Sequence, residues 1–173
     1  AHIETTGPEI WDQTNGTIDG FICAIGTGGT LSGVGAYLKS KNKGISIGLA
    51  DPMGANMYSF FKTGELKSEG SSITEGIGQG RITENIKDMS LDIPFRVNDS
   101  EALNILYDLI EEEGLFLGLS SGINIAGAKK LAKSLGKDKT IVTILCDSAN
   151  RYQNKMFNAG FLEENNLPIP SWL

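Results

Sequence analysis

A short segment rich in glycine and threonine has the composition of a loop that binds an anion. It consists of Gly26, Thr27, Gly28, Gly29 and Thr30. The apolar run 21–25 precedes it, and apolar residues at helical spacing follow it over residues 31–38. In this arrangement a strand leads through a glycine-rich turn into a helix. Free backbone N–H groups and the positive end of the helix dipole then point to one place. We therefore expect this loop to bind a phosphate or a similar anion, with a plain tight turn as the alternative.

Two further polar segments follow apolar runs and are expected at the same end of a sheet. Ser120 and Ser121 come after the apolar residues 115–119, and Cys146-Asp147 stands at the end of the apolar run 140–146. In open α/β sheets, ligands bind beyond the C-terminal ends of the strands. We therefore expect the loop 26–30, the serines and Cys146-Asp147 to converge on one site. The alternative for the serines is that both cap the helix that follows them.

The composition limits the classes of protein to consider. The chain has 173 residues, 40% of them hydrophobic, which suffices for one domain with a core or for part of a larger one. A net charge of -6 without a basic block disfavours nucleic acid and anionic membranes as partners, and no apolar run is long enough to span a membrane. One histidine and no cysteine pair give no metal site. Cys23 and Cys146 lie in apolar runs, which predicts buried, reduced thiols in a cytoplasmic protein rather than a disulfide.

Apolar runs and helical patterns alternate along the chain. Strands are expected over residues 21–25, 45–50, 94–97 and 140–146, the last being the clearest buried strand. This alternation predicts an α/β fold with an open, mainly parallel twisted sheet and helices on both faces. The irregular, glycine-rich connection 62–92 is expected to form a wall or lid of a site, with a surface loop as the alternative.

Helices are expected to start near Thr5, after the loop 26–30, near residue 55, after Asn98 and after Ser121. The last of these helices is expected to carry Ile125, Ala128, Ala132 and Leu135 on one face. A capping box of Asn98 with Glu101 and helix ends at Gly114 and Gly136 complete the pattern. The proline-containing tail 167–173 is expected to be extended and to pack on the body or on a partner.

Three other chemistries fit the residues less well. A dinucleotide loop of the G-x-G-x-x-G type needs glycine where Leu31 stands, although Asp51 lies where a ribose-binding acid is expected. No Gly-Lys-Ser/Thr follows the glycines, as a nucleoside-triphosphate loop requires. A Ser-His-Asp hydrolase would depend on His2, close to a mobile chain terminus, and neither serine lies in a G-x-S-x-G turn.

Five short motifs extend over nearly the whole chain. They are residues 5–11 (TTGPEIW), 26–30 (GTGGT), 76–78 (GIG), 118–122 (GLSSG) and 151–152 (RY). Together and in this order they resemble the cysteine synthase (O-acetylserine sulfhydrylase) family, pyridoxal-phosphate enzymes of fold type II. The resemblance implies pyridoxal 5'-phosphate as cofactor and the formation of L-cysteine and acetate from O-acetyl-L-serine and sulfide. Cystathionine β-synthase is a close relative with the same motifs, so a β-replacement of that kind is the alternative.

The resemblance also implies roles for individual residues. Gly26 through Thr30 would bind the cofactor phosphate, and Gly76, Ile77 and Gly78 would line the substrate cleft. Ser120 would hydrogen-bond the pyridine nitrogen, and Cys146 would lie beside the ring, where many relatives carry proline. A neutral serine opposite that nitrogen would leave it unprotonated, which suits β-elimination and replacement. Ser121 would then be free to cap the next helix.

One part of the family pattern has no counterpart in these residues. In the family, a lysine of the N-terminal half forms a Schiff base with the cofactor, and an asparagine-containing loop there binds the substrate carboxylate. The lysines of this chain lie in polar turns or on expected helix surfaces, so no catalytic residue is assigned. We therefore expect residues 1–173 to be the C-terminal, cofactor-binding portion of such an enzyme, inactive alone. The alternative is a phosphate-ligand binding or regulatory module that acts without the other half.

The resemblance implies partners as well. The small-molecule partners are an amino-acid substrate and sulfide. The protein partners are the N-terminal half of the same enzyme, a second copy in a homodimer, and serine acetyltransferase.

Overall fold

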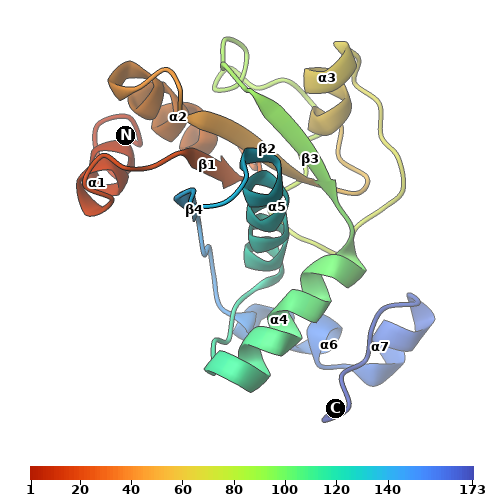
Figure 1. The fold of residues 1–173 in the computed structure, drawn as a ribbon. Coiled ribbons are helices and arrows are strands. Elements are labelled where there is room, and N and C mark those ends of the chain that lie inside the picture. Colours follow the sequence, from red (N-terminus) through yellow and green to blue (C-terminus); the bar gives the residue numbers. More distant parts are fainter.

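The computed structural model describes residues 1–173, and its centre is a sheet of four parallel strands (Figure 1). The strands are β1 (Gly20–Cys23), β2 (Ser46–Pro52), β3 (Ile93–Val97) and β4 (Ile141–Thr143), in the order β3-β2-β1-β4. In the register, Phe21 of β1 stands between Ile47 of β2 and Val142 of β4. The open parallel α/β sheet expected from the sequence is confirmed.

Helices cover both faces of this sheet (Figure 1). Their bounds are α1 (Thr6–Gln13), α2 (Gly29–Lys41), α3 (Met57–Thr63), α4 (Asp99–Glu113), α5 (Leu119–Leu135), a short 3-10 helix at Ala149–Tyr152, α6 (Gln153–Met156) and α7 (Ala159–Glu164). Neighbouring strand residues point to opposite faces. Phe21 therefore packs in one core with α1, α2 and α3, whereas Ile22 packs in another core with α5.

A third, smaller core lies away from the sheet. It joins α4 to the C-terminal helices through buried residues such as Leu106, Tyr152 and Met156. The tail contacts this region, because the ring of Trp172 meets that of Tyr107 edge to face at 5.6 Å between centroids. These contacts confirm that the tail packs on the body of the molecule.

Local signals set most of the helix ends. The Oδ1 atom of Asn98 accepts a hydrogen bond from the backbone N–H of Glu101, as expected for a helix N-cap. Gly114 and Gly136 end α4 and α5 with φ angles of 67° and 93°, which glycine adopts without strain. Thr5 precedes α1 but does not cap it, because its hydroxyl donates to the carbonyl of Ala1 instead.

One detail of the predicted fold is wrong, and it concerns the last strand. Residues 140–146 were expected to form the clearest buried strand, but β4 ends at Thr143 and is only half-buried. Leu145 and Cys146 are exposed, so the expected burial of the Cys146 thiol is also wrong. The reason is position, since β4 is an edge strand that pairs on one side only.

The most deeply buried face of α5 lies beside the apolar face predicted from the sequence, of which Ala128 and Leu135 pack against the same core. Ile123, Ala126 and Leu131 are fully buried, while the predicted set at 125, 128, 132 and 135 is half-buried. Small residues decide this orientation, because α5 lies between the sheet and α4. A Cβ atom on Gly127 would stand 2.5 Å from the Cβ of Ala50, and one on Gly122 would stand 2.9 Å from the carbonyl oxygen of Ala102.

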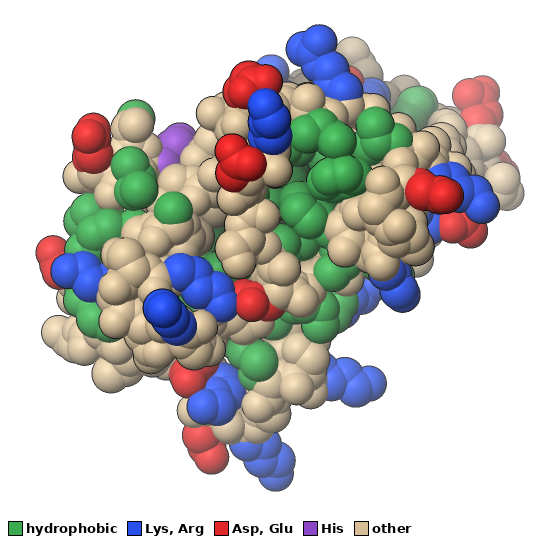
Figure 2. Space-filling model, turned by 90° about the horizontal axis from the view of Figure 1, so that it is seen from above, with side chains coloured by type: hydrophobic (Ala, Val, Ile, Leu, Met, Phe, Trp, Pro, Cys, Tyr) green, Lys and Arg blue, Asp and Glu red, His purple; other side chains and the backbone are tan.

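Hydrophobic side chains also gather on one outer face of the molecule (Figure 2). This view looks down from the top of Figure 1, where α3 lies. Phe60 and Phe61 of α3 are half-buried, contact each other edge to face and pack against the core of the sheet. Packing is thus the role of these aromatic residues.

None of the helices is both long and hydrophobic enough to cross a lipid bilayer.

Candidate functional site

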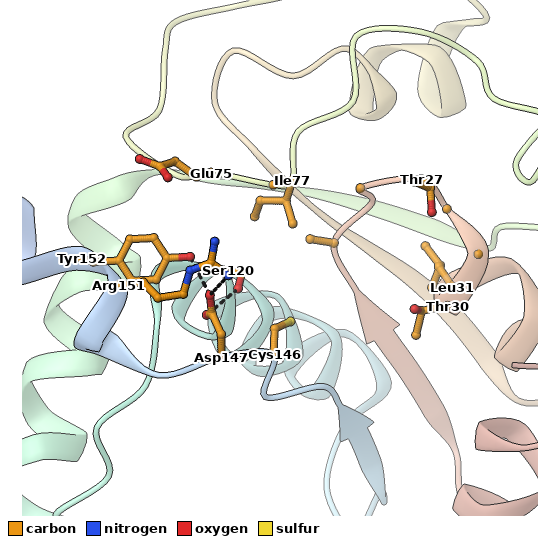
Figure 3. A pocket seen from close by; sticks show the side chains of 15 residues that line it. Thr27, Thr30, Leu31, Glu75, Ile77, Ser120, Cys146, Asp147, Arg151 and Tyr152 are labelled. Carbon is orange, nitrogen blue, oxygen red and sulfur yellow. Dashed lines mark hydrogen bonds and ion pairs between the residues drawn. The ribbon is translucent and has the colours of Figure 1, made fainter.

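A cavity of about 350 Å³ opens beyond the C-terminal ends of β1 and β4 (Figure 3). Its 15 lining residues include the whole loop 26–30, Gly76 and Ile77 from the long connection, Ser120 at the start of α5, and Cys146 with Asp147. The three polar segments expected to converge on one site therefore do so. Ser121 does not line the cavity, although it is the next residue after Ser120.

The loop 26–30 forms one wall, and its shape depends on two glycines. Gly28 has a φ of 88°, and a Cβ there would stand 2.2 Å from the Cγ2 atom of Ile86. A Cβ on Gly26 would stand 2.7 Å from the carbonyl oxygen of Gly76. A side chain at either position would displace the loop, so the wall requires bare backbone at these points.

The carbonyl groups of this wall are held by the connection that follows α3. The carbonyl of Gly26 accepts from Nε2 of Gln79 at 2.9 Å. The carbonyl of Thr27 accepts from Oγ1 of Thr83 at 2.7 Å and from Nδ2 of Asn85 at 3.1 Å. The backbone N–H groups of residues 26–30, in contrast, donate to no acceptor of the protein. They lie at the N-terminus of α2, where N–H groups and the helix dipole bind anions.

The connection 62–92 is therefore a wall rather than only a surface loop. Glu75, Gly76 and Ile77 line the cavity, whereas Gly78 does not. Gly78 donates its N–H to the carbonyl of Ile25 at 3.0 Å and lines a second cavity of about 290 Å³ beside the same loop. Its position thus supports the glycine wall from outside the main cavity.

The opposite wall is made of side chains that bond to one carboxylate (Figure 3). Oγ of Ser120 donates to Oδ1 of Asp147 at 3.4 Å, and the phenol of Tyr152 donates to Oδ2 at 2.8 Å. The guanidinium of Arg151 lies 3.6 Å from Oδ2. Burial, followed by the Asp147 hydrogen bond, raises the pKa of Tyr152 to about 12, so its phenol is a proton donor at neutral pH.

Ser121 has a different role from the expected helix cap. The structure shows no side-chain cap at the start of α5, whose N-cap position is Gly118. The buried hydroxyl of Ser121 instead accepts from the backbone N–H of Cys146 at 2.9 Å. It thereby holds the segment that carries Cys146 and Asp147 against α5. Neither serine is a helix cap.

A buried asparagine joins the two walls, and the sequence analysis missed it. Oδ1 of Asn124 accepts from the N–H of Ala24 at 2.7 Å, just beyond β1. Its Nδ2 donates to the carbonyl of Ile144 at 2.8 Å, just beyond β4. One side chain of α5 thus fixes the ends of two neighbouring strands at the floor of the cavity. A polar residue in the middle of an apolar helix pattern was the available signal.

His2 contacts two threonine hydroxyls. Its Nδ1 lies 2.9 Å from Oγ1 of Thr6 and its Nε2 lies 3.3 Å from Oγ1 of Thr30. These contacts join the first residues of the chain to α2. His2 does not line the cavity, and the hydrolase alternative gains no support from its position.

No lysine lines the cavity, and Arg151 is its one cationic side chain. Several lysines are engaged elsewhere, as Lys39 is with Asp92 and Lys130 with Glu101. Lys155 pairs with Glu75 at 2.6 Å at the margin of the site. The lining residues thus offer backbone donors, hydroxyls, a thiol, a guanidinium and two carboxylates, but no amine.

The fold and the cavity define an open α/β protein with a glycine-rich loop at the C-terminal edge of its parallel sheet. Comparison with known proteins gives the family. The chain belongs to the family described as pyridoxal-phosphate dependent enzymes, which matches residues 1–147.

Individual relatives agree with this assignment. The chain is 50% identical to cysteine synthase 1 of Neurospora crassa over 172 aligned residues. The alignment covers 96% of this chain and 46% of that protein. It is 38% identical to cysteine synthase A of Escherichia coli, with 96% of this chain and 52% of that protein covered. The chain therefore spans about half the length of these curated relatives.

A solved structure shows the same fold. The O-acetylserine dependent cystathionine β-synthase of Helicobacter pylori superposes with a TM-score of 0.79 at 28% identity, covering 89% of this chain and 48% of that chain. This neighbour is a fold type II enzyme, so the predicted fold class is confirmed. The cofactor of the family is pyridoxal phosphate, as the resemblance implied.

The cavity fits that cofactor on its own chemistry. The glycine wall presents unpaired N–H donors at a helix N-terminus and contains no carboxylate that would repel a phosphate. Its close-packed glycines leave no room for side chains to fill the cradle. Ser120 stands on the opposite wall (Figure 3), where a hydroxyl can face a ring nitrogen. The volume of about 350 Å³ is in the range of cofactor pockets.

Proposed function

We propose that the protein containing this chain is a cysteine synthase, which replaces the acetoxy group of O-acetyl-L-serine with sulfide to give L-cysteine and acetate. The names of the relatives support this proposal, as does the identity of 50% over nearly the whole chain. The structural observation that carries it is the cavity itself, in which an anion-binding loop faces a serine hydroxyl. One C–O bond is broken and one C–S bond is formed, with no net oxidation or reduction.

The residues that line the cavity have separate parts in this proposal. When bound, pyridoxal phosphate supplies an electron-withdrawing ring that stabilises the negative charge left when the α-proton of the amino acid is removed. The N–H groups of Gly26 through Thr30 hold its phosphate, and the hydroxyl of Ser120 faces its pyridine nitrogen. Gly76 and Ile77 line the side that receives the substrate, and Cys146 lies beside the ring.

The remaining functions belong to residues outside this chain. We place the lysine that attaches the cofactor and the loop that binds the substrate carboxylate in an N-terminal half, because no lysine lines this cavity. The partners of this proposal are that half, a second copy in a homodimer, and serine acetyltransferase. The free thiols Cys23 and Cys146 support a reducing compartment such as the cytoplasm.

A cystathionine β-synthase type of replacement is the second candidate. It is supported by the solved neighbour, whose title names an O-acetylserine dependent cystathionine β-synthase. In that reaction the acetoxy group would again leave, and the thiol of homocysteine would take the place of sulfide. The two reactions share the cofactor-binding residues and differ only in the sulfur donor.

The test is an assay of the full-length protein with O-acetyl-L-serine and either sulfide or homocysteine. We expect cofactor absorbance in the purified protein and faster formation of L-cysteine than of cystathionine. Preferred formation of cystathionine would favour the second candidate. A full-length protein that binds no cofactor and forms neither product would instead support a phosphate-ligand binding or regulatory module.

A further inference from the structure

Three side chains of the connection that follows α3 hold carbonyl groups of the glycine wall. The carbonyl of Gly26 accepts from Nε2 of Gln79 at 2.9 Å. The carbonyl of Thr27 accepts two hydrogen bonds, from Oγ1 of Thr83 at 2.7 Å and from Nδ2 of Asn85 at 3.1 Å. None of the three donors lines the main cavity. Both carbonyl oxygens therefore point to partners outside that cavity.

The direction of each carbonyl group determines the direction of one N–H group. In a planar trans peptide unit, the C=O of one residue and the N–H of the next point in opposite directions, and the chain contains no cis peptide bond. The carbonyl of Gly26 therefore sets the direction of the Thr27 N–H, and the carbonyl of Thr27 sets that of the Gly28 N–H. Neither N–H has an acceptor in the protein, so both are left to donate to a ligand.

Gly28 makes this arrangement depend on the three donors. Rotation of the peptide unit between Thr27 and Gly28 changes ψ of the threonine and φ of the glycine, and glycine adopts either sign of φ without strain. The structure has the positive φ of 88° at Gly28. A rotated unit would present the carbonyl oxygen of Thr27 to the cavity, where its partial negative charge would repel a phosphate. The hydrogen bonds from Thr83 and Asn85 stabilise the orientation in which the N–H faces the cavity.

A buried contact places the donors beside the glycine wall. Thr83 and Asn85 lie in one turn, in which the carbonyl of Thr83 accepts from the N–H groups of Ile86 and Lys87 at 3.1 and 3.2 Å. Ile86 is 1% exposed and packs in the same core as α2. It lies so close to Gly28 that a Cβ there would stand 2.2 Å from its Cγ2 atom. The turn is thus attached to the wall by a side chain that takes no part in the hydrogen bonds.

We propose that the three donors, Gln79, Thr83 and Asn85, are positioning residues for cofactor binding. They orient the N–H groups of Thr27 and Gly28 toward the phosphate and so raise the affinity for it without contacting it. This inference rests on the proposed cofactor site and extends it to residues outside the main cavity. The contribution of each donor is moderate, because Thr83 is half-buried and Asn85 is exposed, so water can replace part of the bonding.

The test uses the full-length protein from which the cofactor has been removed, and compares the binding of pyridoxal 5'-phosphate with that of pyridoxal, which has no phosphate. Thr83→Val keeps the shape of the side chain and removes its donor. We expect it to weaken the binding of pyridoxal 5'-phosphate about three- to tenfold and to leave the binding of pyridoxal unchanged. Gln79→Leu should show the same selectivity through the other carbonyl. Thr83→Ser retains the hydroxyl and should bind both compounds as the wild type does.

The matched control is Thr63→Val, the same substitution at an exposed threonine whose hydroxyl donates within α3. It should change neither affinity. Equal losses for the two compounds in Thr83→Val and Gln79→Leu, or no loss in either variant, would overturn the inference and leave the proposed function standing. A wild type that binds neither compound would remove the proposed function as well.

Thermal melting of the cofactor-free variants identifies any loss of folding. Thr83→Val and Gln79→Leu remove donors to different carbonyl groups, so each of them tests the inference independently of the other.

Discussion

The two walls of the cavity are built from different parts of the polypeptide. The wall at residues 26–30 presents backbone N–H groups, and its shape depends on missing side chains at Gly26 and Gly28. The wall at Ser120 and Asp147 depends on side-chain hydrogen bonds to one carboxylate. The first wall should therefore be sensitive to added atoms, and the second to removed charge. Substitutions can test this difference one wall at a time.

The largest effect is expected from Gly28→Ala. The residue has a φ of 88°, and its new Cβ would meet Ile86 at 2.2 Å. A left-handed conformation costs an alanine about 1–2 kcal/mol and overpacking about 1–3 kcal/mol, so the free energy of unfolding should fall by about 2–5 kcal/mol. Urea unfolding measures the loss, and absorbance measures the loss of bound cofactor.

Gly29→Ala is the matched control for that substitution. Its Cβ would have its nearest neighbours at 3.8 Å, and it lies in the first turn of α2. Alanine is the better helix former by about 1 kcal/mol, so stability should be unchanged or slightly higher. Equal destabilisation by both alanines would contradict the view that space at Gly28 shapes this wall.

A buried carboxylate near the end of β2 gives the next effect. Asp51 precedes Pro52, the last residue of β2, and is fully buried. Its Oδ2 accepts from the N–H of Tyr58 at 2.7 Å, while its Oδ1 has no partner. Burial raises the pKa of Asp51 to about 6, against the opposing influence of the Tyr58 N–H and the Arg96 guanidinium. The folded protein therefore holds this proton more tightly than the unfolded chain does.

The sign of the pH dependence follows from that difference. The stability due to the tightly held proton is fully present below the unfolded pKa of 3.8 and is lost as the pH rises through about 6. The interval between these pKa values corresponds to about 3 kcal/mol. Relative to the wild type, Asp51→Asn should gain about 3 kcal/mol in free energy of unfolding between pH of about 4 and 7. Asp108→Asn on the exposed face of α4 is the control, and a pH profile identical to that of Asp51→Asn would refute the assignment.

The glycine wall could be predicted from the sequence, whereas only the residues of the side-chain wall, and not their hydrogen bonds, could be predicted. A strand, a loop of glycines and a helix are contiguous in the chain, so residues 21–38 contain the whole arrangement of strand, loop and helix N-terminus. The rule that ligands bind at the C-terminal strand ends then brought Ser120 and Cys146 to the same place. Local patterns and sheet topology were sufficient for this much.

The remaining contacts depend on how distant segments pack. The hydrogen bond from Ser120 to Asp147 and the two bonds of Asn124 join residues far apart in the chain. The buried face of α5 follows from glycines that pack against the sheet and α4, which an apolar pattern does not reveal. The exposure of Cys146 follows from the edge position of β4. Each of these features needs the tertiary structure.

A smaller effect is expected where one side chain connects the two walls. Asn124→Ala would leave the N–H of Ala24 and the carbonyl of Ile144 without their partner. Both residues are half-buried, so water can replace part of the lost bonding, and we expect a loss of about 1–3 kcal/mol. Asn104→Ala, at an exposed position of α4, is the control. A loss no larger than that of the control, by urea unfolding, would show that the strand ends are held in another way.

The two adjacent serines give the smallest change in stability and the sharpest separation of roles. Ser121→Ala removes the buried acceptor of the Cys146 N–H, and we expect a loss of about 1 kcal/mol with little change in cofactor absorbance. Ser120→Ala should change the absorbance and proton affinity of the bound cofactor more than it changes stability, because its hydroxyl faces the cavity. Both substitutions remove one oxygen from neighbouring positions of the same helix turn, so size and helix propensity cancel. If Ser121→Ala altered the cofactor and Ser120→Ala only the stability, the side-chain wall would have been assigned to the wrong serine.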